Sequence, residues 1–386
     1  MHKAKKSILW ITNNWLLDFG GRKIVSKKIL NFLALKKYQI TVLDFEIGEN
    51  LIHNNKKYVD LNRNISFNPF YLPNNKRVII GNVNFSREKD FDFVIISGIG
   101  PVDLLTIASI RIFNLYTKTK IILFEHTNPL FSINLSKFRA IHKVLAQIFY
   151  KRTDFIITPA HSLKNLFVKK FGVSPQKIKV IPHPIIDTNI NKLINEEVEE
   201  KVFKEKKSKI IITSARLDFR QKDYPTLLRA FKIVQGNEPN TFLAILGIGP
   251  DKAKIRQLAK KLNISKKILF LGFQKNPFKY IARSDAFILS SKFEGFGMVL
   301  IEAMACRVPV ITTDAPFGPG EIADLGKNGL LIPVGDEQKM ADAILNLLNN
   351  KKLVKKIVAS GLIKIKQYLS RNSLRNWYTF LGNEKL

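Results

Sequence analysis

Two glutamates stand in a segment that otherwise consists of apolar residues and glycines. Glu294 and Glu302 are eight positions apart, and Gly295 and Gly297 lie between them on either side of Phe296. Carboxylates accept hydrogen bonds from hydroxyl groups, and glycine allows backbone N–H groups to approach a ligand closely. The residue types therefore predict a site for an anionic ligand that also carries hydroxyl groups, such as a nucleotide sugar.

The apolar run from Met298 to Ala305 has the composition of a buried helix that begins near Gly297. At about 1.5 Å rise per residue, Glu302 would lie about a turn and a half inside this helix, and the helix N-terminus would be left free for an anion. Because an unpaired buried carboxylate is costly, we expect Glu302 to have a hydroxyl or cationic partner. The alternative is a strand, turn and helix in which the two acids are a cap and a salt-bridge partner.

A second segment supplies cations at the end of a predicted strand. Arg216 and Lys222 follow the apolar strand 209–214, and Pro225 then opens an amphipathic helix. Loops at strand ends are where cationic side chains converge on a diphosphate in α/β proteins. In so basic a chain, a solvated surface role is the default alternative for both residues.

The order of elements around the glutamates closely resembles the donor-binding segment of the retaining family 4 glycosyltransferases of the GT-B fold. The resemblance rests on the strand Ala286–Leu289, Ser-Ser, the glycine loop, the apolar helix and the run Val308-Pro-Val-Ile311. It is strong over 209–336 and weak over 1–180. It implies an α/β protein with two Rossmann-like doubly wound domains that face a central cleft.

The same resemblance assigns roles in donor binding. Arg216 and Lys222 match an arginine and a lysine that neutralise the diphosphate as it leaves, Glu294 would bind hydroxyls of the donor sugar, and Glu302 would bind the ribose. Backbone N–H groups of the glycine loop and the helix start would contact sugar and phosphate; these residues are Gly295, Phe296, Gly297, Met298 and Val299.

Weaker matches extend the predicted site. His126 ends a strand and matches a histidine near the transferred sugar, and it completes a predicted catalytic set with Glu294, Arg216 and Lys222. Gly20 and Gly21 match a glycine pair that lines the cleft, although Arg22 follows where an acid is common. Phe273 and Gln274 resemble the strand end that meets the base. A structural histidine and a tight strand–helix turn are the alternatives for His126 and the glycine pair.

Apolar runs alternate with amphipathic stretches along the whole chain, which is typical of α/β proteins with parallel sheets. The charged composition of 183–208 predicts a linker there, between domains over 1–182 and 209–365. The resemblance assigns acceptor binding to the first domain and nucleotide-sugar binding to the second, and it implies that a C-terminal helix over 366–386 packs back on the first domain. The predicted strands are Ser7–Thr12, Ile40–Phe45, Val78–Ile80, Phe93–Ser97, Lys120–Phe124, Phe155–Thr158, Lys179–Ile181, Lys209–Ser214, Thr241–Leu246, Ile268–Leu271, Ala286–Leu289 and Pro309–Thr312.

The chain carries 63 Lys/Arg against 31 Asp/Glu, a net charge of +32. Basic residues interleave with apolar ones on two helical patterns, which predicts contact with an anionic membrane surface. The residues are Arg22, Lys23, Lys27, Lys28, Lys36 and Lys37, and then Lys137, Arg139, Lys143, Lys151 and Arg152. Nucleic acid would use the same charge, but no recognition motif accompanies it; biased Lys/Asn/Ile-rich coding is the other alternative. The single cysteine, Cys306, fits a reducing cytoplasm.

The resemblance implies a retaining glycosyltransferase, and the basic helical patterns place it on the inner face of the cytoplasmic membrane. We expect it to move a hexose or N-acetylhexosamine from a nucleotide sugar, UDP-linked by preference, to a glycolipid, polyprenyl-diphosphate-linked or surface-polysaccharide precursor, with no further cofactor and no metal. The Asp90-Phe-Asp92 triplet has no metal-binding companions and is interpreted as a strand entry. The alternatives are another GT-B enzyme, such as a sugar-nucleotide epimerase or a sucrose-type synthase, and a basic nucleic-acid-binding protein.

Overall fold

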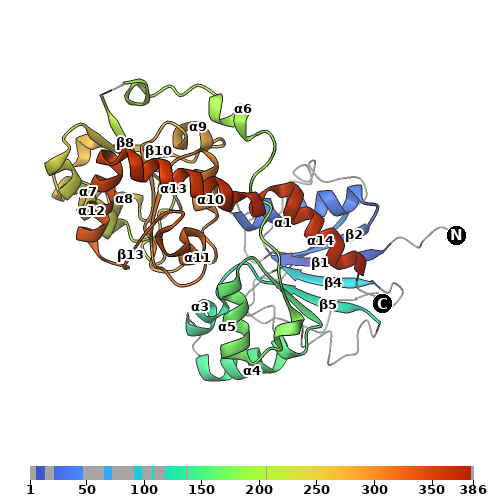
Figure 1. The fold of residues 1–386 in the computed structure, drawn as a ribbon. Helices are drawn as coiled ribbons and strands as arrows, with labels where there is room; N and C mark the ends of the chain where they lie inside the picture. Colours follow the sequence, from blue (N-terminus) through green and yellow to red (C-terminus); the bar gives the residue numbers. More distant parts are fainter. Residues whose placement is uncertain are drawn as a thin grey trace. The chain divides into compact units, whose positions relative to one another are not determined.

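The computed structural model describes residues 6–13, 21–46, 65–71, 91–97, 107, 118–135, 138–205 and 207–383. The chain forms two compact units, each built on its own parallel sheet (Figure 1). Unit 1 comprises Met1–Pro184 together with Ser373–Leu386, and unit 2 comprises Ile185–Asn372. Of the features predicted from the sequence, Gly20, Asp90, Lys137 and the strand Val78–Ile80 lie outside the described residues.

Within the described residues, the sheet of unit 1 has seven strands in the order β3-β2-β1-β4-β5-β6-β7, and every neighbouring pair is parallel. The strands are β1 Ser7–Asn13, β2 Gln39–Glu46, β3 Ile65–Tyr71, β4 Phe93–Ser97, β5 Lys120–Phe124, β6 Phe155–Thr158 and β7 Ile178–Val180. All five residues of β4 are buried, because parallel strands in such sheets are covered on both faces.

Helices of unit 1 connect and cover these strands. They are α1 Gly21–Leu35, α3 Pro129–Leu135, α4 Arg139–Lys151, α5 His161–Phe171, the short 3-10 helix η2 Pro175–Lys177, and most of α14 Ser370–Asn383. The C-terminal helix α14 buries Trp377 against Trp10 of β1 and Phe124 of β5, at ring-centroid distances of 6.1 and 4.8 Å. This aromatic contact holds the end of the chain on the first unit.

The sheet of unit 2 has six parallel strands in the order β10-β9-β8-β11-β12-β13. They are β8 Lys209–Ser214, β9 Thr241–Leu246, β10 Ile268–Gly272, β11 Ala286–Leu289, β12 Val310–Thr313 and β13 Leu330–Ile332. From β8 the chain proceeds outward through β9 and β10, whereas from β11 it proceeds to the other side. The strand order therefore reverses between β8 and β11, which are neighbours.

Unit 2 is completed by helices on its sheet and by its first and last segments. The helices are α6 Ile190–Asn195, α7 Tyr224–Asn237, α8 Lys252–Lys261, α9 Phe278–Ile281, α10 Met298–Ala305, α11 Pro319–Ala323, α12 Glu337–Asn349 and α13 Lys351–Lys364. The 3-10 helices are η3 Lys201–Lys204, η4 Ser265–Lys267, η5 Asp324–Gly326 and η6 Ile365–Tyr368.

The segment predicted as a linker, 183–208, packs within unit 2 over most of its described length. The side-chain amide of Asn276 donates to the carbonyl of Leu193 at 2.8 Å, and the Tyr280 hydroxyl donates to Glu200 at 3.2 Å. The chain passes between the units after Pro184 and again after Asn372. The first crossing lies near the start of the predicted linker, and the second lies within the predicted C-terminal helix.

Two strands were not predicted from the sequence, and both lie at a sheet edge. The first, β3, contains Pro69, and an edge strand tolerates proline because one side of it needs no hydrogen-bond donor. The second, β13, is only three residues long. The other predicted strands within the described residues occur within two residues of their predicted bounds.

Candidate active site

Two loops meet where the strand order of unit 2 reverses. The first loop, residues 215–223, follows β8, and the second loop, residues 290–297, follows β11. Backbone bonds join them: the Lys292 N–H donates to the Gln221 carbonyl at 2.9 Å, and the Asp223 N–H donates to the Ser290 carbonyl at 3.0 Å. Ligands of doubly wound sheets bind beyond the carboxyl ends of the strands at this point. The fold therefore brings the two sequence segments of interest to one place.

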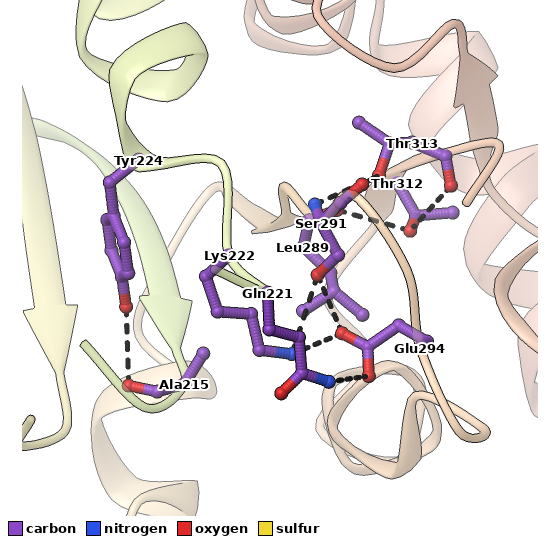
Figure 2. Close-up of polar contacts among 9 residues, drawn as sticks. All are labelled: Ala215, Gln221, Lys222, Tyr224, Leu289, Ser291, Glu294, Thr312 and Thr313. Carbon is purple, nitrogen blue, oxygen red and sulfur yellow. Dashed lines mark hydrogen bonds and ion pairs between the residues drawn. The ribbon is translucent and has the colours of Figure 1, made fainter. Parts of the chain in front are cut away.

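An ion pair between Lys222 and Glu294 links the side chains of the two loops (Figure 2). The side chains of Lys222 and Glu294 are 10% and 7% exposed, so the pair is nearly sealed from water. The Ser291 hydroxyl donates to Glu294 Oε1 at 2.6 Å, and the Gln221 amide reaches Oε2 at 3.4 Å. Lys222 Nζ also lies 3.4 Å from the Ser291 hydroxyl. Each charge is thus held by several partners, as a buried ion pair requires.

The end of a third strand, β12, holds the backbone of Ser291 by hydrogen bonds (Figure 2). The Thr313 hydroxyl donates to the Ser291 carbonyl at 2.6 Å, and the Ser291 N–H donates to the Thr313 hydroxyl at 3.0 Å. The Thr312 hydroxyl donates to the carbonyl of Leu289, the last residue of β11, at 3.2 Å. The carboxylate of Glu294 is therefore positioned by rigid elements.

Arg216 lies in the first loop with its side chain exposed, unlike Lys222. Its guanidinium makes no hydrogen bond or ion pair to any residue within the described ranges. The loop beneath it is firmly held, because the Tyr224 hydroxyl donates to the Ala215 carbonyl at 3.2 Å (Figure 2) and the Asp251 N–H donates to the Leu217 carbonyl at 3.0 Å. A fixed backbone thus carries a guanidinium that is available to an anion.

Glycine permits a close approach behind the first loop. A Cβ on Gly247, in the turn after β9, would lie 2.0 Å from the Ala215 carbonyl oxygen, and one on Gly249 would lie 2.4 Å from the Leu217 carbonyl oxygen. No residue with a side chain fits at these distances. The turn after β9 therefore supports the loop that carries Arg216.

The glycine loop of the second segment leads into α10, whose bounds are those predicted. Gly297 precedes the helix with φ +90°, a left-handed conformation that favours glycine. Phe296 is buried and its ring packs against Tyr368, so its side chain belongs to the core while its backbone borders the site. Met298 and Val299 are half-buried at the first turn of α10, where N–H groups have no carbonyl partner within the helix.

Glu302 is less buried than the sequence predicts. Its side chain is half-buried, whereas Glu294 is the carboxylate enclosed by the fold. Burial raises the pKa of the Cys306 thiol to about 12, with a smaller contribution from the charge of Glu302 one turn earlier. The side chain of Lys222 extends from the first loop to the second loop and forms its ion pair there with Glu294.

The strand end predicted to meet the base follows β10. Phe273 is 56% exposed, and the Gln274 amide donates to the Leu271 carbonyl at 2.6 Å. The Gly247 N–H donates to the Gly272 carbonyl at 2.7 Å, which ties this strand end to the turn after β9. The exposed ring of Phe273 is suited to contact a flat ligand.

His126 lies in unit 1, directly after β5. It is buried, its Nε2 lies 3.1 Å from the hydroxyl of Ser97 at the end of β4, and its ring is 5.1 Å from that of His183. Burial lowers the pKa of His126 well below its usual range, and the charges of His183 and Arg22 act in the same direction. Burial lowers the pKa of His183 to about 3. Both imidazoles are therefore neutral at physiological pH.

A buried acid of unit 1 stands beside the histidine pair. Glu125, next to His126, is buried and accepts hydrogen bonds from the N–H and the hydroxyl of Thr127 at 3.0 and 3.2 Å. Burial raises the pKa of Glu125 to about 7. Of the predicted glycine pair, the structure describes Gly21, which is the first residue of α1.

Four members of these clusters were not predicted from the sequence: Gln221, Ser291, Ser97 and His183. Gln221 and Ser291 were detectable because they sit beside Lys222 and at the end of the strand before Glu294. His183 gave no local signal, since its neighbour His126 is far away in the sequence.

The family is shown by comparison with known proteins. A profile for "Glycosyltransferase Family 4" matches residues 19–188, and one for "Glycosyl transferases group 1" matches residues 194–362. The chain is 32% identical over 309 residues to an uncharacterized glycosyltransferase of Methanocaldococcus jannaschii, across 72% of this chain and 74% of that protein.

A second relative and a solved structure extend the comparison. The relative is the N-acetylgalactosamine-N,N'-diacetylbacillosaminyl-diphospho-undecaprenol 4-alpha-N-acetylgalactosaminyltransferase of Campylobacter jejuni, which is 32% identical over 239 residues, 62% of this chain and 63% of that protein. The structure is Anabaena HepE in complex with UDP and glucose, with a TM-score of 0.75, 18% identity, and coverage of 98% of this chain and 100% of that one. This chain therefore belongs to the family 4 glycosyltransferases and has the GT-B fold.

Proposed function

We propose that this glycosyltransferase moves a hexose or N-acetylhexosamine from a UDP-linked sugar to a lipid-linked precursor of a surface polysaccharide or lipopolysaccharide. The observation that carries the proposal is the buried Lys222–Glu294 pair at the strand reversal of unit 2, beside an exposed arginine, Arg216, and the start of α10. The two cations and the helix start suit a diphosphate, and the carboxylate suits sugar hydroxyls.

The residues of the donor site have different proposed roles, which depend on how far each side chain is buried. Arg216 is exposed and meets the incoming diphosphate first. The ammonium of Lys222 has three N–H donors, of which Glu294 and Ser291 take two, so one remains for a phosphoryl oxygen. Glu294 then uses its remaining lone pairs for the donor sugar, Glu302 binds the ribose, and Phe273 with Gln274 borders the base.

We propose that transfer proceeds with retention at the anomeric carbon and without a protein nucleophile. The bond between the sugar C1 and the diphosphate oxygen breaks while a bond from the acceptor oxygen to C1 forms on the same face. The acceptor proton passes to the departing phosphate, whose charge Arg216 and Lys222 stabilise. His126 of unit 1, buried and neutral, is proposed as the further residue that acts on the transferred sugar. No metal and no cofactor beyond the nucleotide sugar take part.

The acceptor class is supported by the Campylobacter relative, whose name describes an acceptor linked to diphospho-undecaprenol. Donor chemistry is supported by the HepE structure, which contains UDP and glucose. Every described helix is too short or too polar to span a lipid bilayer. We propose that the enzyme meets its lipid-linked acceptor as a peripheral protein on the inner face of the cytoplasmic membrane.

Radiolabelled UDP-sugars incubated with the enzyme and a lipid extract test this function. The expected result is label in the organic phase for one donor of a panel, and loss of that label in Glu294→Gln. Arg229→Gln is the matched control, because Arg229 forms an exposed ion pair with Glu337 in the same unit. Label confined to free sugar or nucleotide would reject lipid glycosylation and favour a different GT-B activity.

A further inference from the structure

Helix α4 of unit 1 carries an exposed apolar stripe. Its members are Ile141, Val144, Leu145 and Ile148, at the spacing of three and four residues that places side chains on one helical face. These residues are 60%, 53%, 37% and 40% exposed, and Phe138 just before the helix is 71% exposed. Exposed apolar patches mark sites of contact with proteins or membranes.

The other side of α4 anchors the helix to unit 1. Ala146 and Tyr150 are buried, and the Tyr150 ring lies 5.2 Å from that of Phe167 and 5.0 Å from that of Phe171, both on α5. The helix packs beside α3 and α5 (Figure 1). Because Ala146 and Tyr150 already supply the contact with the core, the stripe is not needed to hold α4 in place.

The chain segment that contains the stripe is strongly basic. Residues 126–186 contain ten Lys/Arg and a single acid, Asp154, which accepts a hydrogen bond from the Ile121 N–H at 2.7 Å. Helix α4 itself contains no Asp or Glu. Its exposed cations are Arg139, Lys143 and Lys151, with Arg152 just after it.

We propose that this face of α4 docks on an anionic lipid surface, with the stripe entering the headgroup boundary and the cations contacting lipid phosphates. This inference deepens the proposed function, because it identifies the surface by which the enzyme would reach a lipid-linked acceptor. A second copy of this chain is a poor occupant, since both copies would bring the same positive charge. Nucleic acid would pair with the cations but would leave the apolar stripe exposed. A lipid surface accepts both features.

Co-sedimentation with vesicles tests the proposal on the full-length enzyme without donor or acceptor. Vesicles of phosphatidylcholine alone are compared with vesicles that also contain phosphatidylglycerol. The test variants are Ile141→Ser and Lys143→Gln. Their controls are Ile363→Ser and Lys355→Gln, which change equally exposed residues of α13 in unit 2.

We expect binding to anionic vesicles that weakens about fivefold in each test variant and stays at the wild-type level in each control. UDP titrated in parallel should bind all five proteins alike, so a failed donor site and a failed docking surface are told apart. Equal vesicle binding by Ile141→Ser and Ile363→Ser overturns the proposal. A dimer in lipid-free buffer that dissociates in Ile141→Ser, with vesicle binding unchanged, overturns it in favour of a second copy.

Discussion

Glu294, in the loop after β11, holds the ammonium group of Lys222, in the loop after β8, in a buried ion pair. The two residues are 72 positions apart in the chain and meet because β8 and β11 are neighbouring parallel strands. The pair brings one positive and one negative group to the strand reversal, where a sugar diphosphate needs both. The pair therefore couples the stability of unit 2 to its proposed chemistry.

Removing one partner of this pair should destabilise unit 2 strongly. Lys222→Ala leaves the Glu294 carboxylate buried without a cation, which costs about 3–5 kcal/mol in free energy of unfolding. The exposed pair of Arg229 and Glu337 is the matched control, and Arg229→Ala should cost under about 1 kcal/mol. Urea unfolding of the full-length protein, followed in the transition of unit 2, measures the loss in each variant.

The double variant Lys222→Met, Glu294→Gln separates stability from function. It removes both charges, so it should recover most of the stability lost in Lys222→Ala and yet show no glycosyl transfer. Equal destabilisation by Lys222→Ala and Arg229→Ala would contradict a buried pair.

Gly318 allows the loop after β12 to pack against the glycine loop. Its φ is +100°, and a Cβ there would lie 2.1 Å from the Phe296 carbonyl oxygen. Gly318→Ala should therefore lower the free energy of unfolding by about 3 kcal/mol or more and weaken donor binding, because the backbone of Phe296 must move. Gly335 has φ +81°, and a Cβ there would have no atom within 4 Å, so Gly335→Ala should cost only about 1–2 kcal/mol. Similar losses in free energy of unfolding in the two variants would show that the close approach to Phe296 does not contribute to stability.

The two buried histidines of unit 1 predict a loss of stability in acid. In the unfolded chain they bind protons near pH 6.5, whereas the folded state lowers the pKa of both, that of His183 to about 3. The folded state binds fewer protons in this window, so the free energy of unfolding falls as the pH drops from about 6.5 toward 3. Burial raises the pKa of Glu125 to about 7, which has the opposite sign: its contribution is present below about 4.5 and is lost as the pH rises through 7.

Urea unfolding over this pH range measures the slope. His183→Gln should reduce the slope by up to about 1.4 kcal/mol per pH unit, the value for one proton. Parallel curves for wild type and His183→Gln would contradict the neutral buried state of His183.

Ser97 is a positioning residue for His126, because its hydroxyl lies 3.1 Å from Nε2 and is itself 3.4 Å from the hydroxyl of Ser26. Ser97→Ala should lower kcat about tenfold while leaving the donor KM unchanged, since the imidazole keeps its place but loses its orientation. Ser97→Thr retains a hydroxyl and should restore much of kcat. Steady-state kinetics of the two variants decide the point, and an unchanged kcat in Ser97→Ala would remove Ser97 from the mechanism.

Much of unit 2 could be predicted from the sequence, because its signals are local. The helix Met298–Ala305 is apolar throughout except for Glu302 and follows Gly297, so its start and its end were both visible. The edge strand β13 could not be predicted, since three residues carry no periodicity. The edge strand β3 was hidden by Asn68 and Pro69, which a central strand would exclude.

The identity of the buried acid depended on contacts that no local pattern reveals. Glu302 lies among apolar neighbours in the sequence, but its position on α10 leaves it half-buried. Glu294 lies beside glycine, a neighbourhood typical of an exposed loop, and it is buried where Lys222 of the first loop and Ser291 at the end of β11 close around it. His183 likewise reaches His126 only through the packing of unit 1.

Calorimetric titration of UDP and UDP-sugars tests most directly whether the strand reversal of unit 2 binds the diphosphate of a UDP-sugar. Wild type should bind with one site per chain, and Arg216→Gln should bind about tenfold more weakly or worse, because a charged hydrogen bond to phosphate is lost from an exposed residue that the fold does not need. Lys232→Gln, at an exposed lysine of α7, should bind like wild type. An Arg216→Gln enzyme that binds UDP as tightly as wild type would contradict the account.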